Sequence, residues 1–293
     1  MDSQILTAVQ LCEEFLNLKH NHNLVPLSGP GKAIEKGLML HEMLQPYYLA
    51  KKVGKKRDDA AQAALLAGQV FMTGCEFCIA GKCDFHKERP VLGLRNCEPD
   101  EGHEVINTFL QYHEFWKNDS WTTIDVEKVK GKVIYEDEEI SLLWKAKIDW
   151  LVDNEEGIFS TDHKTMGRRE EKLSLNNQFI GQCVVTDQTK MFENIIGFQK
   201  SLKPEEKFLR VPYNFSKERI AEWIIETAGY AYDLVNVQER GVFRHKFISC
   251  RRRYGDCIFR KVCEGEPSDR ERLLQSQFMV GKPWDIGQED NED

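Results

Sequence analysis

The spacing of apolar residues changes once along this 293-residue chain, and that change limits the fold more than any other feature. Over about the first 130 residues, apolar side chains recur every three or four positions, which is typical of helices with one buried face. From Lys132 onward they alternate with polar side chains in three segments, at 133–135, 142–152 and 158–165. Short polar turns join these segments, so we expect them to form an antiparallel meander.

The rest of the chain continues the mixture of helices and strands. We expect a helix over about 174–186, strands near 192–198 and 208–211, and a long amphipathic helix over about 216–235. This order predicts an α/β (α+β) fold in which a mixed central sheet is flanked by helices and preceded by a helical N-terminal region. Since no internal repeat or long linker divides the chain, we expect one domain over residues 1–270.

The charged residues restrict the classes of partner. Asp and Glu number 48 against 40 Lys and Arg, and the net charge of −8 argues against a protein that coats nucleic acid with its whole surface. A local basic groove is compatible with this charge. Part of the acidic excess lies in residues 271–293, which we expect to be a flexible tail. No segment approaches the roughly 20 consecutive apolar residues of a membrane span, and no leader is evident, so we expect a cytoplasmic protein.

A predicted helix over residues 32–45 carries a histidine. Ile34, Leu38 and His41 share one face of this helix, so we expect His41 to point inward. We expect Pro46 to kink or restart the helix, because proline lacks the backbone N–H that the helix needs. An inward histidine is either a packed core residue or a metal ligand, and this helix alone does not decide between the two.

Two aspartates and a lysine would meet at one spot of the predicted meander if the hairpin register brings Asp149 opposite the Asp162 end. Alternation places Asp149 on the opposite side of its strand from Ile148 and Trp150, whereas Asp162 and Lys164 project together from the next strand. Carboxylates are the ligands that Mg²⁺ and Mn²⁺ prefer, and a lysine beside them offsets charge on a phosphate under attack. The trio therefore favours phosphodiester hydrolysis, although Asp and Lys are also common on exposed strands.

Four segments together resemble the RecB-like branch of the PD-(D/E)XK nuclease superfamily. Lys-Ile-Asp-Trp-Leu at 147–151 and Ile-Phe-Ser-Thr-Asp-His-Lys-Thr at 158–165 resemble its catalytic core. Gly-Leu-Met-Leu-His-Glu at 37–42 resembles its Gly-x-x-x-His helix. Gln-Phe-Ile-Gly-Gln at 178–182 stands where that branch has Gln-x-x-x-Tyr, with Gln182 in place of the tyrosine.

This resemblance implies a restriction-endonuclease-like core and a metal-dependent DNA exonuclease acting on single-stranded or end-threaded DNA. It implies that Asp149, Asp162 and Lys164 are catalytic, and that His41, Asp149 and Asp162 bind Mg²⁺ or Mn²⁺. Gln178 would position Lys164 or the DNA strand. Further contacts to DNA phosphates are expected from three arginines, Arg168, Arg169 and Arg251. Between Asp162 and Lys164, His163 faces the other way, so we expect its ring to be packed and its carbonyl alone to face the site.

Nine cysteines are too few and too scattered for a disulfide scaffold, so we interpret them individually. Three of them, Cys250, Cys257 and Cys263, lie near the C-terminus and need a fourth ligand, for which Cys12 is the candidate. One cysteine before the core and three after it resembles the iron–sulfur members of the RecB-like nucleases, of the AddB and CRISPR-associated exonuclease types. The resemblance implies a [4Fe–4S] cluster held by these four residues. Zinc remains the alternative, since thiolates bind both metals.

A second group of soft ligands lies in a Cys-rich segment at 74–97, which we interpret as an insertion. Its zinc-like spacing is given by Cys75, Cys78, Cys83 and His86, with Cys97 as a substitute ligand. The alternative is that these cysteines are reduced and lie in a loop. Cys183, in the helix predicted over 174–186, is expected to be buried.

Two other classes of function remain open at the level of sequence. One is a DNA-binding or recombination module that keeps the nuclease fold without turnover, which the missing tyrosine favours. The other is a zinc-stapled interaction protein with no role on nucleic acid. The chain has no phosphate-binding loop for ATP, so we expect any unwinding to come from a helicase or from a recombination or CRISPR-adaptation partner.

Overall fold

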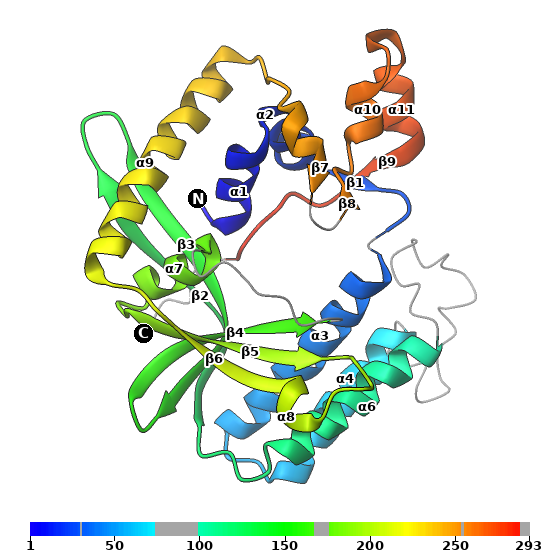
Figure 1. Ribbon diagram of the computed structural model, residues 1–293, viewed down its shortest axis with the longest axis vertical. Coiled ribbons are helices and arrows are strands. Elements are labelled where there is room, and N and C mark those ends of the chain that lie inside the picture. The colour runs from blue at the N-terminus through cyan, green and yellow to red at the C-terminus, as the bar shows by residue number, and fades with distance from the viewer. Residues whose placement is uncertain (30, 74–98, 167–175, 253–254, 288–293) are drawn as a thin grey trace.

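The computed structural model describes residues 1–29, 31–73, 99–166, 176–252 and 255–287. Its centre is a five-stranded sheet in the order β2-β3-β4-β5-β6, in which β4 and β5 run parallel and the other neighbours antiparallel (Figure 1). The strands are β2 (Thr122–Glu136), β3 (Ser141–Asn154), β4 (Gly157–Met166), β5 (Lys190–Gly197) and β6 (Phe208–Asn214). The prediction of a mixed sheet that begins with an antiparallel meander is confirmed.

Helices flank this sheet. The N-terminal ones are α1 (Ser3–Leu11), α2 (Glu13–Leu16), a π-helical turn (Asn17–Asn21), α3 (Lys32–Lys52), α4 (Arg57–Thr73) and α6 (Pro99–Phe115). Those after the meander are α7 (Asn177–Val185), α8 (Pro204–Lys207) and α9 (Lys217–Arg240). The predicted helices near 174–186 and 216–235 correspond to α7 and α9. Among the described residues, no helix has both the length and the apolar character needed to cross a membrane.

Two expectations about the N-terminal half are wrong. The helical pattern was expected to reach about residue 130, but β2 begins at Thr122. Buried Thr123, Val126 and Val129 lie three apart in this strand, a spacing that also fits a helix. A bulge between Thr123 and Asp125 accounts for part of that spacing.

The second expectation concerns the buried face of α3, and the helix also does not restart at its proline. The helix continues through Pro46 to Lys52, because Met43 and Tyr47 on either side of the proline are buried in the same core. That burial offsets the missing hydrogen bond. Ile34 and Leu38 are 59% and 49% exposed, so the face they share is not the buried one.

The C-terminal part closes the molecule onto its beginning. It contains a 3-10 turn (Phe247–Cys250), β7 (Arg251–Arg252), β8 (Gly255–Asp256), α10 (Arg260–Glu264), a 3-10 turn (Pro267–Asp269), α11 (Arg270–Gln277) and β9 (Phe278–Val280). Strand β9 pairs antiparallel with β1 (Leu24–Pro26), so segments far apart in sequence lie side by side (Figure 1). The expectation of a flexible tail that begins at residue 271 is therefore wrong for the described residues up to 287. Residues 288–293 lie outside the described part.

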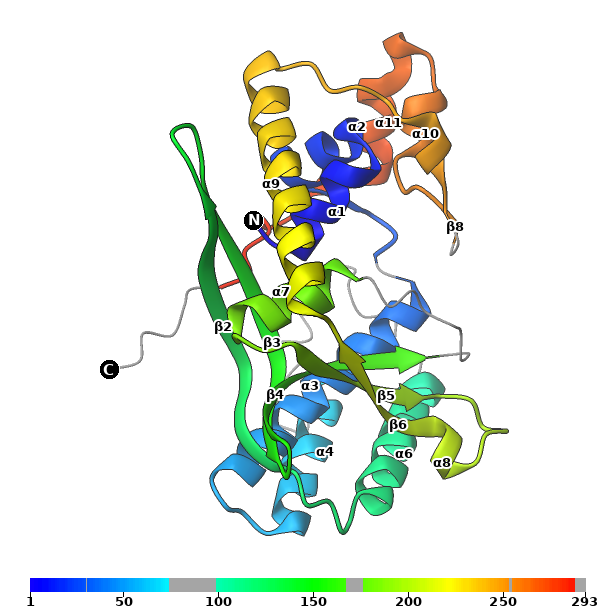
Figure 2. The ribbon, with the colours of Figure 1, turned by 60° about the vertical axis from the view of Figure 1, so that its left-hand side comes forward.

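Two hydrophobic clusters cover different parts of the sheet. The first packs α3, α4 and α6 against Trp150 and Val152 of β3. The second packs α1, α7 and α9 against Trp144 and Ile148 of the same strand. The β2–β3 hairpin extends along α9 (Figure 2). Along the alternate residues of β3, the packing thus changes from the second cluster to the first between Ile148 and Trp150, while Leu151 packs in the second cluster. Asp149 lies between Ile148 and Trp150.

A buried arginine packs on three tryptophan rings, one of which is that of Trp150. The guanidinium of Arg210 in β6 lies 3.8 Å from the ring centre of Trp116, 4.1 Å from that of Trp121 and 5.1 Å from that of Trp150. It donates two hydrogen bonds of 2.7 Å to the carboxylate of Asp119. Both side chains of this ion pair are at most 5% exposed. Removing either residue would therefore leave the charge of the other buried without a partner, which is strongly destabilising.

We predict that Asp119→Ala lowers the free energy of unfolding by about 3–5 kcal/mol, because the Arg210 charge would stay buried without its partner. Urea denaturation followed by circular dichroism measures this. The matched control is Glu222→Ala, which removes the exposed partner of Arg219 and should leave the midpoint nearly unchanged. Equal effects of the two substitutions would contradict the prediction.

Candidate metal site and cysteine cluster

The pairing of β3 with β4 brings the two predicted aspartates together. The last pair in their register is Trp150 with Thr161, so Asp149 and Asp162 lie at the next position of each strand. Beyond this last pair, a side chain makes the contact between the strands: Asp149 Oδ2 accepts a hydrogen bond of 2.8 Å from the backbone N–H of His163. This register places both carboxylates at one end of the meander, which is the condition for the three residues to meet.

His41 approaches the same point from α3. Its Nε2 donates to the carbonyl oxygen of His163 at 3.0 Å, and its Nδ1 lies 3.8 Å from Asp149 Oδ2. Gly37, one turn earlier, makes this approach possible, because a Cβ there would lie 2.9 Å from Thr165 Oγ1 in β4. The Gly-x-x-x-His spacing therefore has a physical basis: the glycine lets the helix lie close to the strand, and the histidine reaches over it.

A hydrogen-bonded network holds Asp162 and Lys164. Asp162 is fully buried, and its Oδ1 accepts hydrogen bonds from Gln178 Nε2 at 2.6 Å and from Gln182 Nε2 at 3.4 Å. Its Oδ2 lies 2.5 Å from the ammonium nitrogen of Lys164, which also donates to Gln178 Oε1 at 3.0 Å. Helix α7 thus supplies two amides that fix the carboxylate and the lysine. Gln182 points toward Asp162 where the resembled motif has a tyrosine.

Glu127 of β2 joins the site, although no sequence motif marks it. Its carboxylate lies with ligand atoms of His41 and Asp149 in a group of three, all within 4.8 Å of one another. It also forms an ion pair with Lys147. Its backbone has φ +56°, in the left-handed region that a non-glycine residue adopts only at a cost in free energy. Such a residue in mid-strand indicates that the surrounding structure holds the side chain in place.

The group of three differs from the predicted ligand set in one member. Within the described ranges, Glu127 occupies the place that the sequence assigned to Asp162. The oxygens of Asp162 already face Lys164, Gln178 and Gln182. Asp162 remains next to the group and acts on it through its charge.

The close approach of these buried charged groups changes their pKa values. Burial first, and then the charge of Asp162, hold the pKa of the Asp149 carboxyl well above its usual range. Burial lowers the pKa of His41. Burial also opposes the charge on Lys164, but Asp162 and Asp149 outweigh it and raise the pKa of that ammonium. Lys164 is therefore a fixed positive charge. The carboxylate form of Asp149 is disfavoured by burial and by Asp162, and a bound cation would relieve that penalty.

The donor set fits a hard divalent cation. It offers an imidazole, the carboxylates of Asp149 and Glu127 and the nearby carbonyl oxygen of His163. Oxygen-rich sites of this kind suit Mg²⁺ and Mn²⁺. As expected, the ring of His163 is buried and stacks on Tyr48 and Trp150, while its carbonyl faces His41.

The four cysteines predicted as cluster ligands also meet. They line one small cavity with Phe15 and Phe259. Cys12 lies at the α1–α2 junction, Cys250 ends the 3-10 turn after α9, Cys257 directly follows β8, and Cys263 lies in α10. The cavity lies on a hydrophobic cluster that joins the N-terminal helices to α10 and β9. The structure thus unites residues more than 230 positions apart.

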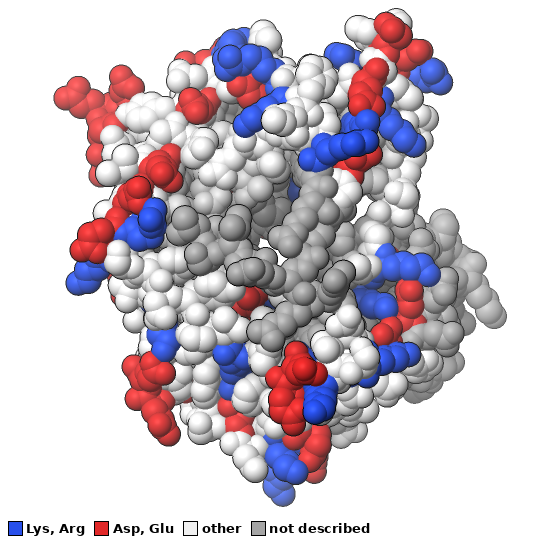
Figure 3. Space-filling model, in the orientation of Figure 1, with Lys and Arg blue, Asp and Glu red and all other residues white. Residues whose placement is uncertain are grey.

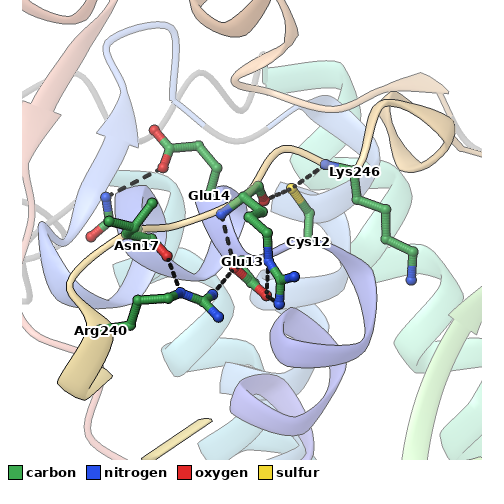
Figure 4. Close-up of polar contacts among 8 residues, drawn as sticks. Cys12, Glu13, Glu14, Asn17, Arg240 and Lys246 are labelled. Atoms are coloured by element: carbon green, nitrogen blue, oxygen red, sulfur yellow. Dashed lines mark hydrogen bonds and ion pairs between the residues drawn. The ribbon is translucent and has the colours of Figure 1, made fainter. Parts of the chain in front are cut away.

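A set of polar contacts keeps Cys12 beside the C-terminal loop (Figure 4). Glu13 accepts hydrogen bonds from Arg240 at 2.6 Å and from the Arg244 side chain at 2.9 Å and backbone at 2.8 Å. The backbone N–H of Lys246 lies 3.3 Å from Cys12 Sγ. The loop after α9 is therefore held on the N-terminal helices by contacts that need no metal.

The spacing of the thiols bears on the choice of metal. Tetrahedral zinc with bonds of about 2.3 Å requires sulfur atoms about 3.8 Å apart. In the described part of the chain, the four thiols form no group of three within 4.8 Å. Burial, followed by the charges of Glu14 and the other thiolates, raises the pKa of Cys263 to about 12. A bound metal would have to displace that proton.

The remaining predicted residues are placed as follows. Arg251 is exposed and is the backbone partner of Asp256 in the β7–β8 pair. It therefore lies on the hairpin between Cys250 and Cys257. Cys183 is buried, as expected. The other candidates lie outside the described residues: Arg168, Arg169, Cys75, Cys78, Cys83, His86 and Cys97. On the face in Figure 3, the acidic and basic side chains of the described residues are interspersed.

Comparison with known proteins gives a distant structural neighbour. No protein-family model matches the chain, and no curated protein matches it. A solved structure titled "Crystal structure of SSO0001" is similar over 69% of this chain and 84% of its own, with 12% sequence identity and a TM-score of 0.31.

A close contact between α7 and β3 generates a second prediction. A Cβ at Gly181 would lie 2.6 Å from ring atoms of the buried Trp144, so Gly181→Ala should push α7 away from the sheet. We expect a loss of about 1–3 kcal/mol in the free energy of unfolding, as for other overpacked cores, measured by urea denaturation. The control is Gly229→Ala in α9, where nothing lies within 4 Å and alanine should be neutral or stabilising. A neutral Gly181→Ala would contradict the packing described above.

Proposed function

We propose that this chain is a divalent-metal-dependent deoxyribonuclease of the RecB-like PD-(D/E)XK type, and that its sheet is a restriction-endonuclease-like core. The observation that carries the proposal is the convergence of Asp149, Asp162 and Lys164 from two paired strands, with His41 reaching the same point from α3. The strand order, with a meander followed by the β4–α7–β5 crossover, supports the proposed core.

Each residue of the site has a distinct task under this proposal. His41, Glu127 and Asp149 would hold Mg²⁺ or Mn²⁺, with Asp162 beside them. The cation would supply a Lewis acid for a phosphate oxygen and a water of lowered pKa. The ammonium of Lys164, kept charged by its neighbours, offsets negative charge on the scissile phosphate. Gln178 keeps that ammonium and the Asp162 carboxylate in fixed positions.

The proposal includes a [4Fe–4S] cluster at the four cysteines. Their convergence on one cavity supports a metal, and the order of one cysteine before the core and three after it, which resembles the iron–sulfur members of the family, favours a cluster over a single zinc. The protein would then degrade single-stranded or end-threaded DNA as an exonuclease, and any unwinding would come from a helicase or an adaptation partner.

The catalytic assignment predicts the effect of Asp149→Asn. With Mn²⁺ and end-labelled single-stranded DNA, we expect this variant to lose at least about 100-fold in rate, because the substitution removes the charge that faces the cation. The control is Asp153→Asn, an exposed position on the same strand, which should cleave normally. Cleavage by Asp149→Asn at the control rate would remove the assignment. Metal-independent DNA binding without cleavage by the parent protein would favour a non-catalytic module instead.

The role given to Glu127 predicts a change in metal requirement. In Glu127→Gln, the Mn²⁺ concentration for half-maximal activity should rise at least about tenfold, since one carboxylate ligand is lost. The exposed Glu136→Gln, at the end of the same strand, serves as control. An unchanged titration curve would show that Glu127 is not a ligand.

The cluster assignment predicts colour. Protein purified without oxygen should show a broad absorption band near ~400 nm and bound iron, and Cys257→Ser or Cys12→Ser should lose both. Cys183→Ala should keep them, because Cys183 lies in the hydrophobic core around α7. A colourless parent protein containing one zinc per chain would show that the cysteines bind zinc and not an iron–sulfur cluster.

A further inference from the structure

A cavity of about 310 Å³ lies beside Asp149, where both ends of the chain meet β3 and α7. Its walls include Asp2 near the N-terminus, Lys145 and Asp149 of β3, Gln182 of α7, and Trp284 and Asp285 of the segment that follows β9. This segment returns toward the sheet as the red trace in Figure 1. The volume is at the lower end of the range for small-ligand pockets.

Trp284 is fixed and yet open on one side. Its indole N–H donates to Asp2 Oδ2 at 2.7 Å, while Asp2 Oδ1 caps α1 by accepting from the backbone of Gln4 and Ile5. The side chain is still 43% exposed. A rigid aromatic ring that keeps one part of its surface uncovered offers a platform on which a flat, apolar group can stack.

Gln182 provides a second and independent indication of a ligand. Its side chain is fully buried, its amide nitrogen is turned to Asp162, and its Oε1 has no hydrogen-bond partner among the described residues. A buried acceptor left unpaired is unfavourable. Because Gln182 lines the cavity, a ligand with an O–H or N–H group could pair with it there.

The charges of the lining decide which part of a nucleotide fits. The lining holds three aspartates, Asp2, Asp149 and Asp285, against two lysines, Lys145 and Lys147, and Lys147 is already paired with Glu127. Such a lining does not attract a phosphate into the body of the cavity. The phosphate belongs at the Asp149 end, where Lys164 and the cation lie, whereas a base and sugar have no charge to be repelled.

We propose that this cavity binds the base and sugar of the nucleotide whose phosphate lies at Asp149, with Trp284 stacked on the base and Gln182 accepting a hydrogen bond. The proposal rests on the proposed nuclease function for the position of the phosphate. It makes the C-terminal segment a part of the substrate site.

The experiment measures binding, so that it does not depend on cleavage. Titration of the full-length protein with dAMP in Ca²⁺, followed by isothermal titration calorimetry, should give a measurable Kd. Trp284→Ala should raise the Kd at least about tenfold, whereas Trp284→Phe, which can still stack, should stay within about threefold. The control is Val280→Ala, an exposed position in β9 before the segment, which should bind as the parent does. No binding of dAMP by the parent, or equal Kd values for Trp284→Ala and the parent, would overturn the proposal.

A second measurement separates stacking from a general loosening of the segment. A single-stranded oligonucleotide whose terminal nucleotide is abasic should bind the parent at least about tenfold more weakly than the normal oligonucleotide, at either the 5′ or the 3′ end. Trp284→Ala should not distinguish the two, because its stacking partner is already absent. Equal discrimination by both proteins would refute the role of Trp284. Binding without cleavage would refute the nuclease proposal alone, and cleavage without discrimination would refute this inference alone.

Discussion

The position of Asp149 between two hydrophobic clusters is the constraint on which the site depends. Trp150 is buried against α3, and Ile148 is buried against α7, so β3 is fixed on both sides of the aspartate. The carboxylate cannot withdraw into either cluster without burying its charge there, which is unfavourable. It lies instead where α3, β4 and α7 all come within reach. Packing thus places the acidic group, and the helices that provide the packing also carry His41 and Gln178.

Closure of the chain ends is a second constraint, and it does not depend on a metal. Strands β1 and β9 pair, Glu13 holds the loop after α9, and Trp284 is bonded to Asp2. These contacts bring four cysteines to one cavity and one tryptophan to another. A metal at the thiols would lock an arrangement that hydrogen bonds and apolar packing already favour. Such preorganisation lowers the entropy that ligand binding must overcome.

The sequence could predict the elements whose periodicity is unambiguous. The meander, α7, α9 and the meeting of Asp149, Asp162 and Lys164 follow from alternation and hairpin length, and the meeting of the cysteines agrees with the resemblance. Glu127 escaped prediction because its position depends on a backbone torsion that no local pattern encodes. The exposure of Ile34 and the continuity of α3 through Pro46 were also unpredictable, since both depend on which face of the helix meets the sheet. Tertiary packing overrides local preference in these cases.

The net charge of −8 limits how the proposed nuclease would hold DNA. A protein that neutralises many phosphates binds with a steep dependence on salt, because each contact releases counterions. On the face in Figure 3 the charges of the described residues are interspersed, and the lining next to Asp149 has more acidic than basic residues, so neither offers a continuous basic track. Affinity would then come from few phosphate contacts, from the cation, and from stacking on Trp284. Because stacking hardly depends on salt, binding through this site should weaken only gently as ionic strength rises.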